Sequence, residues 1–263
     1  MDANRRGFLA GVSVLAGATW GEWPLPRHSV QAMPPDWMPL QDPAIVKEVV
    51  GVSHTDVKRV RELVEKQPAL ANATIDWGFG DWESALGAAS HVGRREIAEV
   101  LLAHGARPTI YSAAMLGRLD VVKAFVAASP GIQRTLGPHG IPLLAHARAG
   151  GAAAAEVVRF LEGLGDADRR PPSQPLSAQD RDAVVGEYTF GPGPRDYFVV
   201  DVRNDQLGLE RPGQTRRFLI HTGSLVFFPS GVPSVRIAFA RSGARADQVT
   251  IADPDVFLTA KRR

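Results

Sequence analysis

Similar stretches of sequence recur through the middle of this chain, and they constrain its fold more than any other feature. Three of them read ALGAASHVGRREIAEVLLAHGA, IYSAAMLGRLDVVKAFVAASP and GIPLLAHARAGGAAAAEVVRFLEGLG. They align on Gly93, Gly117 and Gly151; small residues precede each glycine, and an acidic residue with aliphatic neighbours follows it. A weaker copy, VSHTDVKRVRELVEKQP, has Ser53 in place of the glycine. A unit that recurs in this way predicts stacked pairs of short helices.

The best copy, Ser84 to Ala106, resembles the ankyrin repeat, in which two short helices and a projecting hairpin form one unit. The run Ser84-Ala85-Leu86-Gly87 stands where that family has Thr-Pro-Leu-His. Ser84 is expected to cap the first helix, and Gly93 to permit a tight turn before the second. The anchors at positions 53, 93, 117 and 151 are unevenly spaced, so the connections are expected to differ in length. The resemblance implies an α-helical ankyrin solenoid domain at 33–168, with about four repeats over 43–168.

The last third of the chain has a different composition, rich in β-branched and aromatic residues separated by turn sequences. A proline-rich linker is expected at 169–182 and a small antiparallel β-barrel-like domain at 183–263, so that the whole chain is a multidomain α + β protein. The runs VGEY, NDQLGL and FFP make this region similar to the lipocalin-like domain that follows some bacterial β-lactamase-like serine hydrolases. Seven or eight short strands, of an antiparallel barrel or sandwich, are expected, with candidates at 184–190, 197–202, 206–210, 216–221, 225–228, 235–239, 248–251 and 256–259.

The N-terminus has the layout of a bacterial export signal, with charged residues before an apolar run. Arg5, Arg6, Phe8 and Leu9 resemble the twin-arginine signal, whose pathway carries folded proteins across the inner membrane. Cleavage is expected after Ala18 or Ala32, and the length of such signals favours Ala32, which gives a signal peptide at 1–32. We therefore expect a periplasmic protein with no stable membrane insertion after cleavage. An uncleaved anchor or a buried helix is the alternative.

Composition excludes several classes of function. Thirty basic and 28 acidic residues nearly balance, so no nucleic-acid partner is expected. The chain has no cysteine, and none of its seven histidines forms a close metal-binding pair, so no metal and no cofactor are predicted. The sequence lacks a Gly-x-Ser-x-Gly or Ser-x-x-Lys motif, and the protein is predicted not to be an enzyme. Asp76, Asp81 and Glu83 are interpreted as turn and capping residues.

The loop at 77–82, which lengthens the first repeat step, is the main candidate for function, because it carries three aromatic residues close to a histidine. Such residues are frequent anchors of protein interfaces, although they could instead pack over the end of the helical stack. The expected function is non-catalytic binding of a protein partner through the repeat surface. A small-molecule ligand in the β domain and an enzyme with an interdomain site, gathering His91 or His146 with carboxylates, are the alternatives. The residues predicted to contact the partner are Trp77, Phe79, Trp82, His91 and Met115.

Overall fold

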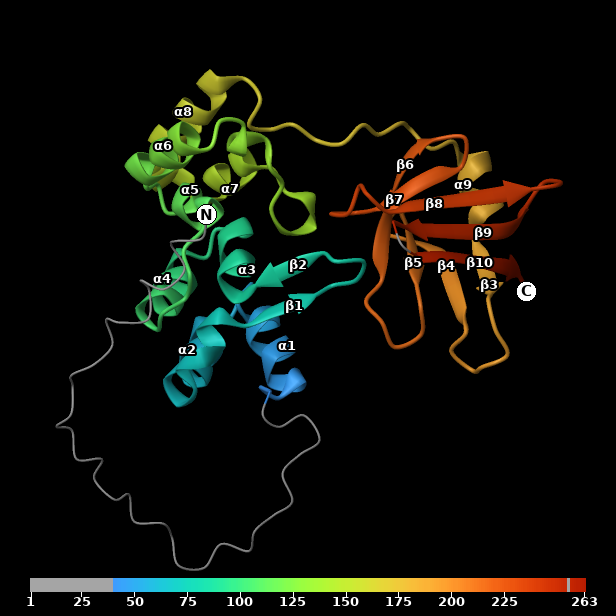
Figure 1. Ribbon diagram of the computed structural model, residues 1–263, viewed down its shortest axis with the longest axis horizontal. Coiled ribbons are helices and arrows are strands. Elements are labelled where there is room, and N and C mark those ends of the chain that lie inside the picture. The colour runs from blue at the N-terminus through green and yellow to red at the C-terminus, as the bar shows by residue number, and fades with distance from the viewer. Residues whose placement is uncertain (1–39, 255) are drawn as a thin grey trace, which may run out of the picture. The chain divides into compact units, whose positions relative to one another are not determined.

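The C-terminal part of the chain is a closed antiparallel β-barrel (Figure 1). The computed structural model describes residues 40–254 and 256–263. Neighbouring strands pair in the order β10-β3-β4-β5-β6-β7-β8-β9, so the barrel predicted from the sequence is confirmed. Its strands are β3 (Gly186–Thr189), β4 (Tyr197–Arg203), β5 (Gln206–Glu210), β6 (Arg217–Gly223), β7 (Val226–Pro229), β8 (Arg236–Arg241), β9 (Ala246–Asp253) and β10 (Val256–Arg262).

The interior of the barrel is filled by its own side chains. Tyr188, Phe227 and Ile237 are almost fully buried there, and the rings of Phe227 and Phe239 meet edge to face. Alternating residues along each strand supply this core, as expected of a small barrel. A filled interior argues against the alternative of a ligand enclosed within the barrel.

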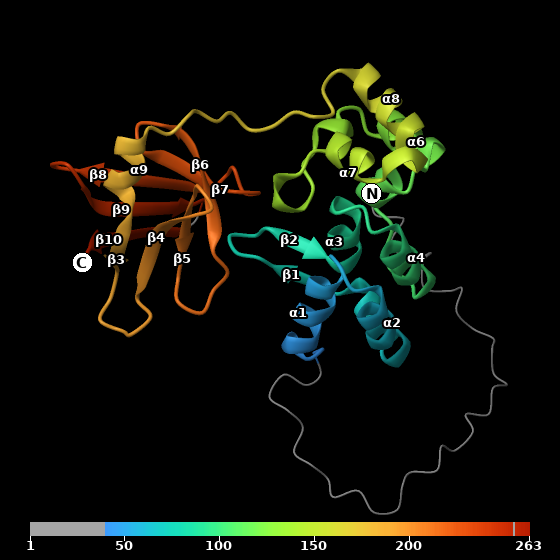
Figure 2. The same ribbon diagram turned by 180° about the vertical axis from the view of Figure 1, so that it is seen from behind.

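A short helix, α9 (Ala178–Val184), leads into the barrel from the segment expected to be only a linker. Ser177 caps its first turn, and Arg262 of β10 donates hydrogen bonds to the carbonyl oxygens of Ala183 and Val185. The helix lies beside the barrel in both views (Figures 1 and 2). Arg262 therefore ties the last strand to the start of the domain, where β10 meets β3.

Short helices precede the barrel, and several local expectations about them are confirmed. The Ser84 hydroxyl caps α3 by accepting a hydrogen bond from the Gly87 N–H, and Gly93 has a φ of 75° in the turn that follows. The helices are α1 (Pro43–Val52), α2 (Val57–Lys66), α3 (Ala85–His91), α4 (Arg95–Ala103), α5 (Ile110–Met115), α6 (Leu119–Ala128), α7 (Leu143–Ala149) and α8 (Ala155–Leu164). A hairpin of β1 (Thr74–Asp76) and β2 (Trp82–Ser84) lies between α2 and α3.

The predicted ankyrin solenoid is wrong. A solenoid needs one unit and one connection repeated along a continuous core. Here one connection is a β-hairpin, the next, 104–109, contains neither strand nor helix, and the one after α6 holds the two 3₁₀ turns Ile132–Arg134 and Pro138–Gly140. The apolar side chains also form two separate clusters, one centred on α1–α4 and one on α5–α8. The similar sequences therefore specify similar pairs of helices and turns, but these pairs do not form a regular stack.

No helix in the described part of the chain is both long enough and apolar enough to cross a membrane. The predicted signal residues Arg5, Arg6, Phe8 and Leu9 lie outside the described residues. Export through the twin-arginine pathway therefore stays a prediction.

His146 is a buried residue of α7 whose titration should affect the stability of the fold. Its Nδ1 donates to the Pro142 carbonyl at 3.0 Å, its ring lies against Tyr111, and its Nε2 is buried with no hydrogen-bond partner in the part of the chain that the structure describes. Burial, reinforced by the nearby charge of His91, lowers the pKa of His146 to about 4 and outweighs the Pro142 hydrogen bond. The imidazole is therefore neutral in the folded protein at neutral pH.

We expect the folded protein to lose stability as the pH falls from about 6.5 to about 4, because the unfolded chain takes up the His146 proton first. The loss should reach about 3 kcal/mol of unfolding free energy. Urea unfolding of wild type and His146→Leu at pH 7.5 and 4 measures it. The wild type should lose about that much more than the variant, and His104→Gln should behave as wild type. Equal acid losses in wild type and His146→Leu would contradict the assignment.

Candidate metal centre

The β1–β2 hairpin directs one carboxylate into the protein. The Asp76 carboxylate accepts hydrogen bonds from the N–H groups of Gly78 and Gly80, at 2.8 and 3.0 Å, and this closes the turn. Successive residues of a strand point to opposite faces. In β2 the Trp82 side chain consequently faces solvent, with 62% of its surface exposed, whereas Glu83 is completely buried.

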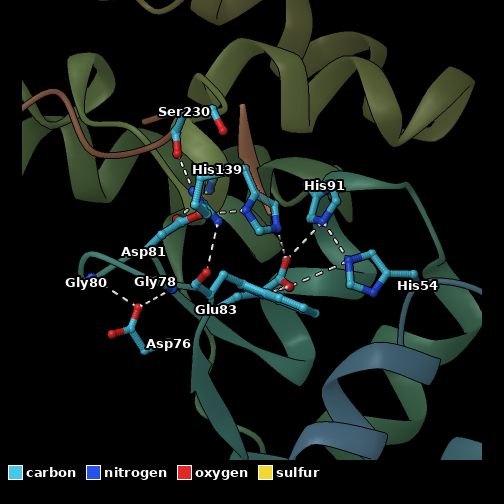
Figure 3. Close-up of polar contacts among 11 residues, drawn as sticks. His54, Asp76, Gly78, Gly80, Asp81, Glu83, His91, His139 and Ser230 are labelled. Atoms are coloured by element: carbon cyan, nitrogen blue, oxygen red, sulfur yellow. Dashed lines mark hydrogen bonds and ion pairs between the residues drawn. The ribbon is translucent and has the colours of Figure 1, made fainter. Parts of the chain in front are cut away.

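Three histidines converge on the Glu83 carboxylate (Figure 3). His54 follows α1, His91 ends α3, and His139 lies in the 3₁₀ turn before α7. Each of the four residues offers one ligand atom, and these atoms all lie within 4.8 Å of one another. The group is the pattern of a transition-metal site, three imidazoles and one carboxylate.

The separations between the ligand atoms fit coordination of one ion. A tetrahedral zinc ion with ligands at roughly 2.0–2.1 Å places neighbouring ligand atoms roughly 3.3–3.4 Å apart. The Nε2 atoms of His54 and His91 are 3.1 Å apart, and Glu83 Oε1 lies 2.9 Å from His91 Nε2 and 3.3 Å from His139 Nε2. Despite these short approaches, Oε1 is buried and, within residues 40–254 and 256–263, receives no hydrogen bond of proper direction. A cation shared among the four groups would satisfy it.

Outer contacts orient the ligands so that their Nε2 atoms face the centre. His54 donates from Nδ1 to the Gly51 carbonyl at 2.9 Å, and His139 Nδ1 contacts the Asp81 carboxylate at 2.7 Å. The Trp77 indole donates to Glu83 Oε2 at 2.7 Å and fixes the rotation of that carboxylate. Carboxylates and carbonyls bonded to the far nitrogen of a histidine are typical of metal ligands, because they set the tautomer and raise its basicity.

Asp81 is the centre of this outer layer. Its carboxylate also accepts the backbone N–H of His139 at 2.8 Å and pairs with Arg217 of β6, with Nη2 and Oδ2 2.5 Å apart. Arg217 donates further to the carbonyl oxygen of Ser230, and both ion-pair side chains are at most 6% exposed. His139 is held with a φ of 59°, a left-handed conformation that costs a non-glycine residue about 1 kcal/mol or more. Both Asp81 contacts are thus made by a histidine that is held in a strained conformation.

The charges at the site are strongly coupled. Burial raises the pKa of Glu83, but the close approach of His139 and His91 outweighs it and brings the value to about 2. Burial lowers the pKa of His139, but Asp81 and Glu83 outweigh it and raise the value to about 9. Burial likewise raises the pKa of Asp81, and the contacts from His139 and Arg217 bring it below its usual range. Both carboxylates are ionised at neutral pH, and an entering metal ion would replace the proton on His139.

The five residues predicted to contact a partner lie in different environments. His91 is a metal-ligand candidate, and Trp77 is a half-buried support of Glu83. Phe79, at the hairpin tip, packs against the barrel core, and only Trp82 projects into solvent. Met115 is fully buried among the helices, so its predicted partner contact is wrong: no part of its side chain is exposed.

Sequence reasoning missed His54, Glu83 and His139 as ligands and Asp81 as their support. The interpretation of Asp81 and Glu83 as turn and capping residues is wrong, because both carboxylates are buried and face histidines. The expectation that the chain lacks a metal site rested on the absence of cysteine and on histidine spacing, and the four ligands come from separate segments. One signal was present: Ser53-His54 and Ser90-His91 repeat at the ends of α1 and α3, and both serine hydroxyls donate to the carbonyl four residues earlier.

No protein-family model matches the chain, and no curated sequence matches it.

Proposed function

We propose that this protein binds one divalent first-row transition ion through His54, Glu83, His91 and His139. The observation that carries the proposal is the convergence of three imidazole nitrogens on a fully buried carboxylate whose Oε1 atom has no hydrogen bond from any described residue. Nitrogen-rich sets with one carboxylate suit zinc and its neighbours, whereas calcium and magnesium require oxygen ligands. Zinc is the ion we favour, because four ligands of this kind complete its tetrahedral shell.

The site can also support chemistry. The side chains of His54 and His139 are about a quarter exposed, at 25% and 27%, so solvent reaches the edge of the cluster. A water molecule entering the shell of a bound zinc ion becomes acidic near neutral pH. Because a zinc ion with four protein ligands has no open position, metal-assisted hydrolysis would require that water molecule to displace one of the four.

Titration with cobalt(II) tests the proposal, because tetrahedral cobalt(II) absorbs strongly in the visible range. The metal-stripped full chain should develop this spectrum with one equivalent of cobalt and lose it when zinc competes. His91→Gln should weaken binding about a hundredfold or more by removing one ligand, whereas His104→Gln should bind as wild type. A wild-type titration without a saturable spectrum, or an unaffected His91→Gln variant, would refute the site.

Trp82 supports a second function, contact with a protein partner. Its indole is exposed beside the metal centre, and exposed tryptophans frequently anchor interfaces. Trp82→Ala should reduce capture of a specific partner at least tenfold without changing metal content, measured by affinity capture followed by metal analysis. Trp77 is unsuitable for this test, because its loss would disturb Glu83. Equal capture by wild type and Trp82→Ala would remove the tryptophan from any interface.

A further inference from the structure

A cavity of about 220 Å³ adjoins the metal centre, and His139 is common to both. The cavity is open on one side and is lined by the loop around His139, by the segment leading to α9, and by β6 and β7 of the barrel. An engineered cavity of about 150 Å³ holds benzene. The space therefore suits a molecule of roughly ten non-hydrogen atoms.

The barrel supplies an apolar wall to this cavity. Ile220 of β6 and Phe228 of β7 face each other across neighbouring strands. Their sequence neighbours Leu219 and Phe227 belong to the barrel core, so Ile220 and Phe228 lie on the outer face. Phe228 is nevertheless only 8% exposed. This part of the outer surface is thus covered by the facing segments, without being filled by them.

The only charges that the lining residues can carry are positive, and they belong to Arg170 and His139. Within the described part of the chain, Arg170 has one ion pair, with Asp168 at 3.6 Å, and both side chains are largely exposed. Exposed pairs of this kind contribute little and exchange readily. The Arg170 guanidinium is consequently available to a ligand, and its two parallel N–H groups match a carboxylate.

The two halves of the cavity lining pack closely against each other at Gly140 and Gly231. A β-carbon on Gly140 would lie 3.1 Å from the Cα atom of Gly231, and one on Gly231 would lie 3.0 Å from the Asp81 carboxylate. Both glycines have positive φ values, 71° and 88°. This close approach fixes the cavity relative to the residues that orient His139.

We propose that this cavity binds a small carboxylic acid, with its apolar part against Ile220 and Phe228 and its carboxylate on Arg170. The inference goes beyond metal binding and does not require it, because none of these contacts uses the ion. If the metal centre is catalytic, the acid is a product or substrate analogue held next to the ligand His139.

Benzoate, with nine non-hydrogen atoms, is a suitable probe, and benzyl alcohol is its neutral counterpart. Ligand-observed NMR titrations of the full chain, both metal-free and zinc-loaded, should show saturable benzoate binding and weaker binding of benzyl alcohol. Arg170→Gln should weaken benzoate binding about tenfold and leave benzyl alcohol unchanged. Arg169→Gln is the matched control, since it removes the neighbouring exposed charge and does not line the cavity; it should bind benzoate as wild type.

Absence of saturable benzoate binding would overturn the proposal. So would equal losses in the two arginine variants, because that result would indicate attraction by surface charge alone. Preferential binding of benzyl alcohol would overturn it as well and point to a neutral ligand. The metal-free arm separates the two inferences, since benzoate binding there is expected even if the protein binds no ion.

Discussion

Glu83→Gln is expected to abolish metal binding at micromolar ion concentrations. The substitution keeps the shape of the side chain but removes the only anionic ligand from a buried position. A neutral amide oxygen cannot balance the charge of a divalent ion in surroundings with little water. Affinity should fall on the order of a thousandfold, more than the 10–100-fold typical of an outer-shell substitution.

The same substitution should remove the stabilisation that the ion gives the folded chain. A ligand that binds only the folded state, at a thousand times its dissociation constant, adds about 4 kcal/mol to the free energy of unfolding. Urea unfolding with and without zinc should show this gain in wild type and none in Glu83→Gln. Glu99→Gln is the matched control, because it removes an exposed glutamate of α4 that pairs with Arg95.

A folding defect in Glu83→Gln can be told apart from a lost ligand by the metal-free measurement. If metal-free Glu83→Gln unfolds cooperatively and shows no zinc-dependent gain, the carboxylate is a ligand. A gain equal to that of wild type would show that zinc binds elsewhere, and the proposed centre would then be wrong.

Local chemistry made parts of this fold predictable. The barrel strands were found because alternating apolar residues and turn sequences act over a few residues at a time. The cap at Ser84 and the turn at Gly93 were equally local. The solenoid could not be predicted in this way. Repetition in the sequence specifies helix pairs, whereas the stacking of these pairs depends on connections that differ here at every step.

The metal centre was beyond sequence reasoning for a related reason. Two histidines on one helix can be recognised as a metal-binding pair from their spacing, but His54, His91 and His139 come from three separate segments of the chain. Their meeting point is fixed by the hairpin that places Glu83 between them. Glu83 itself belonged to a run of acidic residues in a turn-rich segment, where solvated carboxylates are the ordinary outcome. Only the register of β2, which turns Trp82 outward, shows that Glu83 must point inward.

Arg217→Met should weaken metal binding although Arg217 contacts none of the ligands. Arg217 neutralises Asp81, and Asp81 holds His139 through both its ring and its backbone N–H. Without the guanidinium, the Asp81 carboxylate is left as a buried charge with His139 as its main partner, and the orientation of that histidine changes. We expect a 10–100-fold loss of zinc affinity and about 3 kcal/mol less unfolding free energy for the metal-free protein.

The double variant Asp81→Asn/Arg217→Met separates positioning from stability. Removing both charges together eliminates the unpaired buried carboxylate, so much of the lost stability should return. Zinc affinity should stay low, because an amide supports the imidazole less well than a carboxylate does.

Arg216→Met is the matched control for Arg217→Met. Arg216 is the preceding residue, its side chain is only 10% exposed, and it pairs with Asp201 at 2.8 Å instead of Asp81. Its zinc affinity should equal that of wild type. If Arg216→Met and Arg217→Met lost equal affinity, the effect would come from general damage to the barrel and not from Asp81. If Arg217→Met retained full affinity, the barrel would have no part in positioning His139, and the ligands would be held by the helices and the hairpin alone.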